Sequence, residues 1–492
     1  MSRTLAWPRR QLASTSVLLG VLLSLAAAPS AAPGQAPHLD RTAPAVRPDS
    51  AKVLGVEDYA RWRTIEDEAI SGDGRWVTWV YRHTNVADAD EEPELHVLDL
   101  ETSRDTAIAD ASDGRFSPDG RWIAFRVDSM PERGGGAGPD APRGRGDDRE
   151  PSHRIELREL ATGATRVWHD MQSAVFSRDS KFLLLRDRPA PQGRGRGRFG
   201  GGGGSGDDES AGGSDAILVD LAAGRGQLLG SVVDAAFNRA GDMLAYSVDA
   251  EAKDANGLYV VDLSTGARQA LRTGARTYAG LAWSEAGTGV AVLEGDDVPD
   301  MLHRDAVLLV VPDVRAALRD PTVAPATLDT TAAAFPDGWV ISDDGPLAWS
   351  EDGRRVFLGA RPQRPASDTV PVESSDSTTD VDVWSTSDRY VQSVQMSRAE
   401  RERSFSYRQA FDVRRGAFVQ LGDSTMRELE LSTDGRWAVG RDERAYISDW
   451  RPSRADYYRV DTATGERTLM LSGQLTRHAF GISPDGRTFL YW

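Results

Sequence analysis

A four-residue corner of the Ser-x-Asp-Gly type recurs along this chain, and no other feature restricts the fold as strongly. Serine and aspartate oxygens accept backbone N–H bonds, and glycine adopts the positive φ that a tight turn needs. Apolar residues flank each copy, so each corner predicts a strand, a turn and a second strand. The eight copies or variants start at Ser71, Ser117, Ser177, Asn238, Ser284, Ser350, Ser432 and Ser483.

A second turn follows each corner at the end of another alternating strand. Examples are LHVLDLETS, IELRELATG, AILVDLAAG, LYVVDLSTG and YYRVDTATG. Each repeat therefore predicts four strands, here termed A to D, and the shorter repeats have the length of one propeller blade. The sequence predicts an all-β fold over 53–492, a β-propeller of seven four-stranded blades plus a partial eighth.

Length variation is concentrated in the connection between strands B and C. Three such connections lack apolar residues and are predicted to be disordered insertions near 131–151, 191–215 and 364–380. In an up-and-down blade the B–C and D–A connections share one face. We expect that face to be the binding face.

Some segments depart from the regular repeat. In the fifth unit Ala306–Val311 serves as strand C with no Thr-Gly turn after it, and FPDGWV from Phe335 imitates the corner. Short helices are expected at Glu57–Arg63 and after Ser397, which has capping-box spacing to Glu400. The eighth unit starts at its corner and stops at Trp492, so we expect an unclosed ring and a fragment of a longer protein.

The N-terminus is typical of an export signal. A basic start precedes the apolar run SVLLGVLLSLAAA and small residues, which predicts a signal peptide over 1–32 and a disordered linker over 33–52. We expect a periplasmic or extracellular protein that lies outside the membrane once the signal is cleaved. The chain has no cysteine, which excludes disulfides and thiol chemistry.

Charge and motifs exclude several classes of function. A formal net charge of -17 disfavours nucleic-acid binding. No Gly-x-Ser-x-Gly elbow occurs; the nearest match, GGSGD at Ser205, and the Gly195–Gly200 match to Gly-x-Gly-x-x-Gly both lie in low-complexity sequence. The paired acids Glu91 and Glu92 are expected to point apart. We therefore predict no catalytic, cofactor-binding or metal-binding residue in this chain.

Histidine and tryptophan are expected to be structural. No two of the seven histidines have the H-x-x-x-H spacing of a local zinc site: His38, His83, His96, His153, His169, His303 and His478. The tryptophans at equivalent repeat positions favour packing between blades over stacking on a ligand: Trp76, Trp122, Trp283, Trp349 and Trp437.

The corners resemble the propeller repeats of the prolyl oligopeptidase family and of the periplasmic Tol-system propeller. Two longer segments are similar to exported members of the first: the propeller entry Val56–Tyr81 and a late-blade segment, Asp380–Val413. In the late segment, Ser385 and Thr386 follow Trp384 where the family usually carries a Trp-His-Trp-type run. The resemblance implies a propeller that precedes an α/β-hydrolase domain, which would lie beyond residue 492.

This resemblance implies the substrate-gating domain of an exported serine peptidase that acts on short peptides and is inactive alone. The alternative is a free-standing periplasmic propeller that binds a protein or peptide. A propeller lyase or glycosidase would need clustered histidines or carboxylates at the starts of the A strands, and the sequence has none.

Overall fold

The computed structural model describes residues 55–84, 93–129, 152–187, 212–320, 322–366, 391–448 and 451–492. Strands dominate these ranges and all of their pairings are antiparallel, which confirms the mostly-β prediction. No helix in the described ranges is long and apolar enough to span a membrane. The helical elements are η2 (Val56–Arg61), η4 (Lys253–Ala255), α1 (Val314–Arg319), α2 (Gln392–Arg403) and η6 (Thr476–His478).

The first two sheets are simple four-stranded meanders in which each strand pairs with the next. The first contains β1 (Arg63–Ile70), β2 (Trp76–His83), β3 (Glu94–Asp99) and β4 (Arg104–Ala109). The second contains β5 (Ala111–Phe116), β6 (Trp122–Ser129), β7 (Ser152–Glu159) and β8 (Thr165–His169).

A seven-stranded sheet follows, and it consists of two such units that share one strand. Residues 225–232 of β12 pair with β11, whereas residues 232–237 pair with β13. The D strand of the third unit therefore continues without a break into the A strand of the fourth. The strands are β9 (Ser173–Phe176), β10 (Phe182–Arg186), β11 (Ser214–Asp220), β12 (Arg225–Phe237), β13 (Met243–Val248), β14 (Gly257–Asp262) and β15 (Ala267–Thr273).

The remaining sheets repeat the meander with small departures. The fifth unit contains β16 (Thr277–Trp283), β17 (Val290–Gly295), β18 (Val307–Val311) and β19 (Ala326–Leu328). The sixth contains β20 (Trp339–Ser342), β21 (Ala348–Trp349), β22 (Arg355–Pro362), β23 (Tyr407–Asp412) and β24 (Ala417–Val419). The seventh sheet contains β25 (Glu428–Leu431), β26 (Trp437–Asp442), β27 (Arg454–Asp461) and β28 (Arg467–Leu475). A final two-stranded sheet contains β29 (Ala479–Ile482) and β30 (Phe489–Tyr491).

Each corner is held by hydrogen bonds that its sequence dictates. In the second unit Ser117 Oγ donates to Asp119 Oδ1 at 2.6 Å and accepts from the Trp122 backbone N–H at 2.9 Å. The Asp119 carboxylate also accepts from the Arg121 N–H, and Gly120 has a φ of 69°. The same bonds recur at the corners that start at Ser71, Ser177, Ser350, Ser432 and Ser483.

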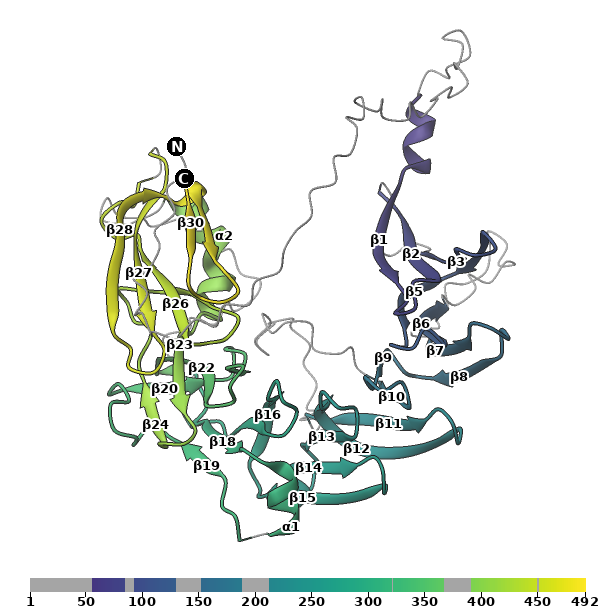
Figure 1. The fold of residues 1–492 in the computed structure, drawn as a ribbon, viewed down its shortest axis with the longest axis horizontal. Coiled ribbons are helices and arrows are strands. Elements are labelled where there is room, and N and C mark those ends of the chain that lie inside the picture. Colours follow the sequence, from purple (N-terminus) through teal and green to yellow (C-terminus); the bar gives the residue numbers. More distant parts are fainter. Residues whose placement is uncertain are drawn as a thin grey trace, which may run out of the picture.

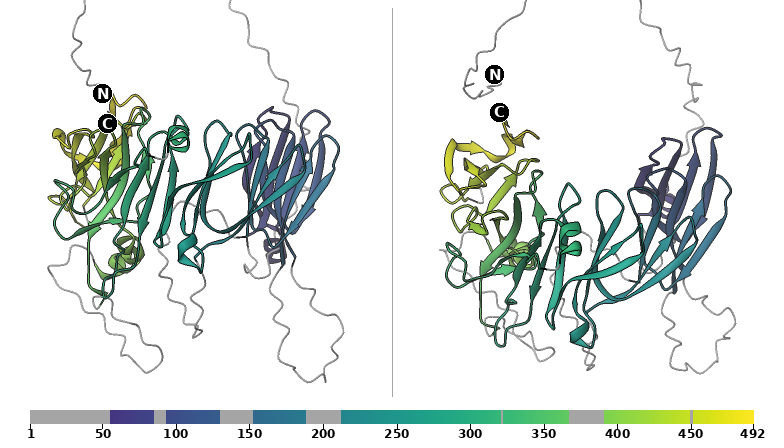
Figure 2. Two further views of the ribbon diagram at one scale, coloured as in Figure 1. Left: turned by 90° about the horizontal axis from the view of Figure 1, so that it is seen from below. Right: turned by 60° about the horizontal axis from the view of Figure 1, so that its bottom comes forward.

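Consecutive corners contact one another, which places them in one row. Asp119 N donates to Ser180 Oγ in the next corner at 3.0 Å, and Asn238 Nδ2 donates to the Gly287 carbonyl at 3.2 Å. A Cβ on Gly435 would lie 2.8 Å from that of Ser350. Figure 1 shows the sheets following one another along an open arc, with β1 and β30 at its two ends. Figure 2 shows the same succession from the side. This arrangement is consistent with a β-propeller.

The core is a series of layers between neighbouring sheets. One cluster joins the first and second sheets through residues such as Leu95 and Phe125, and the next joins the second and third through Trp122 and Leu183. Equivalent tryptophans also bridge sheets: Trp283 Nε1 donates to Ala236 O at 2.8 Å, and Trp349 Nε1 to Ala282 O at 3.1 Å. These contacts confirm the packing interpretation of the repeated tryptophans.

One expectation about a local boundary was wrong. Ser397 lies inside α2, which begins at Gln392, and its Oγ donates to the Val394 carbonyl, so it is no N-cap. Residues 191–211 and 367–380 of the insertions predicted near 191–215 and 364–380 lie outside the described residues; β11 starts at Ser214, and Pro365 forms a bridge to Met301. Segment 131–151, the signal peptide and the linker lie outside the described residues.

Candidate functional site

The described histidines provide no base for a nucleophile. His96 Nδ1 lies 2.9 Å from an oxygen of Asp105, and its ring stacks on Trp79; His153 Nδ1 lies 2.6 Å from Asp128. No hydrogen bond joins a histidine ring to a serine or threonine hydroxyl in the described ranges. No metal-binding group of three or more His, Asp or Glu side chains occurs there either. Ser205, the Gly195–Gly200 segment, His38, Glu91 and Glu92 lie outside the described residues.

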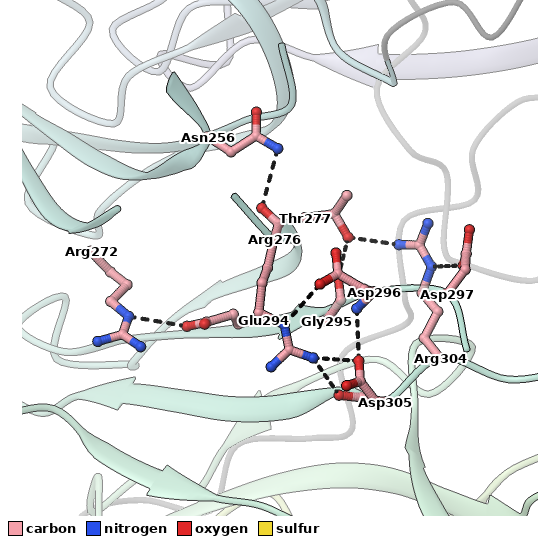
Figure 3. A network of polar contacts seen from close by, with 10 residues as sticks. All are labelled: Asn256, Arg272, Arg276, Thr277, Glu294, Gly295, Asp296, Asp297, Arg304 and Asp305. Atoms are coloured by element: carbon pink, nitrogen blue, oxygen red, sulfur yellow. Dashed lines mark hydrogen bonds and ion pairs between the residues drawn. The ribbon is translucent and has the colours of Figure 1, made fainter. Parts of the chain in front are cut away.

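The face that carries the B–C and D–A connections is ordered by ion pairs in the fifth unit (Figure 3). Arg276, at the D–A connection before β16, forms ion pairs with Asp296 and Asp305 of the B–C connection. Arg304 binds Asp297 at 2.8 Å and Thr277 Oγ1 at 3.0 Å. Each of the three aspartates in this network forms an ion pair with an arginine, so the network fixes the loop.

A hollow lies on the sixth unit, beside the connection between α2 and β23. It is a cavity of about 220 Å³ between the β20–β21 connection, the end of β22 and the segment from α2 to β23. Gly345 and Gly359 make this close approach possible, because a Cβ on Gly359 would lie 2.4 Å from Ser406 Oγ. The lining residues are Asp344, Gly345, Pro346, Gly359, Arg401, Ser404, Phe405, Ser406 and Arg408.

A buried ion pair supports the floor of this cavity. Arg361 Nη1 lies 2.6 Å from Asp344 Oδ2, and Arg361 Nη2 donates to the Arg403 carbonyl at 2.6 Å. Burial raises the pKa of the Asp344 carboxyl, and the nearby charge of Asp343 adds to that effect while Arg361 opposes it. Burial lowers the pKa of Arg361. The two charged side chains bind each other and the backbone of Arg403, so neither of them is available to a ligand.

His303 lies beside this ion pair and stays neutral. Burial, and then the positive charge of Arg361, lower the pKa of the imidazole to about 4. Its Nε2 is buried without a hydrogen-bond partner among the described residues. Gln363 binds both backbone groups of His303, at 3.1 Å and 2.7 Å. The histidine is therefore locked in place and does not reach a hydroxyl.

Two arginines give the cavity a positive wall. Arg408 is partly buried, and this burial lowers its pKa; Nη1 donates to the Pro346 carbonyl at 3.2 Å. Within the described ranges neither Arg408 nor the exposed Arg401 forms an ion pair. Phe405 adds an apolar surface, and the Arg427 guanidinium lies 4.1 Å from the centre of its ring. Such a wall can bind a carboxylate beside an apolar group, but it cannot activate a nucleophile.

Sequence reasoning named no residue of this cavity. Arg401 and Arg408 lie in the described part of the late-blade segment Asp380–Val413, whereas Asp380–Tyr390 lies outside the described residues. A half-buried arginine without an acid has no local signature, because its lack of a partner depends on residues distant in sequence. A clue was available in the density of arginine in the run SRAERERSFSYR.

No family model matches the chain, and no curated protein matches it. Similar solved structures include the β-propeller domain of the Trilobed protease from Pyrococcus furiosus, at 12% identity and a TM-score of 0.33, covering 84% of this chain and 97% of that one. An acylaminoacyl peptidase of Pyrococcus horikoshii matches at 12% identity and a TM-score of 0.32, covering 84% of this chain and 53% of its own. These values add nothing to the fold assignment, which rests on the sheets themselves.

Proposed function

We propose that this chain is the propeller part of an exported serine peptidase, where it gates access of short peptides. In this proposal the fold has seven four-stranded blades of the Asp-Gly repeat type plus the β29–β30 hairpin as part of an eighth. The hydrolase domain, which would carry nucleophile, base and oxyanion hole, is its expected partner. The single observation that carries the proposal is a repeat scaffold whose described residues bring no base to a hydroxyl.

The cavity on the sixth unit supports a role in peptide binding. Arg401 and Arg408 offer guanidinium groups that no described carboxylate neutralises, and Phe405 offers an apolar contact. A short peptide presents both a carboxylate and apolar side chains, so this face suits its C-terminal end. The proposal includes no cofactor, no metal and no nucleic acid.

Two experiments test this function. The first reads the gene beyond the codon for Trp492: we expect an α/β segment containing Gly-x-Ser-x-Gly, whereas an immediate stop codon would favour a free-standing binding propeller. The second assays the purified chain on chromogenic dipeptides, where we expect no turnover. Turnover by the purified chain, whether or not a serine-directed inhibitor stops it, would overturn the proposal.

Peptide binding is tested separately by fluorescence anisotropy with labelled tri- and tetrapeptides. The double variant R401Q/R408Q should weaken binding at least tenfold, since a charge-assisted pair contributes roughly 1.5–3 kcal/mol. Amidation of the peptide C-terminus should have the same effect on the original chain. Equal affinity of free-acid and amidated peptides would contradict the assigned role of the two arginines.

A further inference from the structure

A second cavity lies at the opposite end of the sixth sheet, where the corners and C–D turns meet. It has a volume of about 390 Å³. One wall is the corner that leads into β22, another is the β23–β24 turn, and the β27–β28 turn of the next sheet completes it. The lining residues are Arg354, Arg355, Asp412, Arg414, Arg415 and Ala463.

At the equivalent place in the first sheet the corner arginine is paired with acids. The corner arginine Arg75 lies 3.0 Å from Asp99 at the end of strand C and 3.2 Å from Glu101 in the C–D turn. Leu100 N donates to the Arg75 carbonyl, so the corner and the turn are in fixed register. The first sheet therefore supplies two acids to one arginine.

In the sixth sheet the same register brings like charges together. Val413 N donates to the Arg354 carbonyl, as Leu100 N does to that of Arg75, which places Arg414 in the position of Glu101. Arg415 follows it, and Arg355 follows Arg354. An acid of the first sheet is thus replaced by an arginine, and two further arginines are added beside it.

The one carboxylate in the cavity wall is committed to the turn. Asp412 Oδ1 accepts the backbone N–H groups of Arg414 and Arg415, at 3.1 Å and 2.9 Å. Its other oxygen lies 3.8 Å from Arg415 Nε, beyond hydrogen-bond distance. Asp352 of the corner lies 3.8 Å from Arg354 Nε, so four guanidinium groups face two carboxylates, a local excess of two positive charges in a chain whose net charge is -17.

Arg355 is the least satisfied of these arginines. Its Nε and Nη1 are buried and have no hydrogen-bond partner in the described part of the chain. A guanidinium that is largely shielded from water and has no hydrogen bond to an acid attracts an anion more strongly than an exposed one, because the local dielectric screening is weak. Like-charge repulsion among the four arginines also falls when an anion binds.

We propose that this cavity binds a small polyanion, a molecule that carries two or more phosphate or carboxylate groups. An arginine binds a phosphate or a carboxylate through two parallel N–H···O hydrogen bonds. The volume of the cavity is in the range of small-molecule sites. The ligand would lie between the sixth and seventh sheets and hold them together. Binding of the anion therefore stabilises the folded chain as well as neutralising the charge of the arginines.

Isothermal titration calorimetry of the purified chain with sodium pyrophosphate and with citrate tests the site. We expect at least one probe to bind at low ionic strength, with an affinity that falls as salt is added. The double variant R414Q/R415Q should weaken binding at least tenfold. The matched control Arg121→Gln, at the paired corner of the second sheet, should bind as the original chain does. Preference for pyrophosphate would assign a phosphate ligand, and preference for citrate a carboxylate one.

The melting temperature gives a second readout. The probe that binds more tightly should raise the melting temperature of the original chain and leave the melting temperature of the double variant unchanged. If the double variant fails to fold, Arg354→Gln supplies an independent variant. No binding of either probe at millimolar concentration, or unchanged affinity in the variants, would overturn the proposal.

Discussion

The corners of the second and sixth sheets have nearly the same backbone and opposite electrical surroundings. Ser117 and Ser350 make the same bonds to the aspartate two residues on and to the N–H five residues on. Arg121 at the second corner binds Glu159 through two nitrogens, at 2.9 Å and 2.8 Å. At the sixth corner the equivalent acid is Asp412, but it begins a turn that carries Arg414 and Arg415, so arginines outnumber acids there. Residues that repeat build the scaffold, and departures from the repeat mark the places where a ligand is expected.

The largest expected effect tests what the two corners share. Ser117→Ala and Ser350→Ala should each lower the free energy of unfolding by about 2 kcal/mol, because both hydroxyls are fully buried and each loss leaves a backbone N–H without an acceptor. Denaturant titration measures both. Ser483→Ala, at a partly exposed corner, should cost clearly less. Unequal losses at Ser117 and Ser350 would show that the two corners differ in more than charge.

The next effect is a pH dependence of stability that arises at only one end of the sixth sheet, where His303 lies. The pKa of His303 is held at about 4, well below the 6.5 of the unfolded chain. The unfolded chain therefore binds more protons between these values, and stability should fall as pH drops from 6.5 to 4. His303→Gln should remove part of that fall, about 1–2 kcal/mol after allowance for partial solvent exposure. An unchanged pH profile in the variant would place the imidazole in contact with water.

The smallest effect tests the charge difference itself. Arg121→Gln removes an ion pair and a cation–π contact with Trp122, so its melting temperature should fall by a degree or two, on the order expected for an exposed pair. Arg414→Gln removes only repulsion, so it should leave the melting temperature unchanged or slightly raised at low salt. Added salt should reduce both differences. A fall for Arg414→Gln equal to that for Arg121→Gln would contradict the assignment of unpaired charge to the sixth corner.

Much of the scaffold could be predicted from the sequence because its signals are local. The Ser, Asp and Gly of each corner bond to one another within six residues, and the long B–C connections follow from counting between corners. The fusion of two units through β12 was not predictable, since no residue in 225–237 marks the change of partner. Neither cavity was predicted, because the lack of an ion pair at Arg408 and of a hydrogen-bond partner for Arg355 Nε and Nη1 is set by residues far away in the sequence.

The most direct test of the central claim is covalent labelling with a fluorophosphonate probe, which reacts with activated serines. Six described corner serines donate to an aspartate within their own turn, Ser284 accepts only backbone N–H groups, and none of the seven bonds to a described histidine ring. Intact-mass analysis of the purified chain after incubation should show no adduct. A stoichiometric adduct on any serine would contradict an account in which this chain binds and positions but does no acyl chemistry.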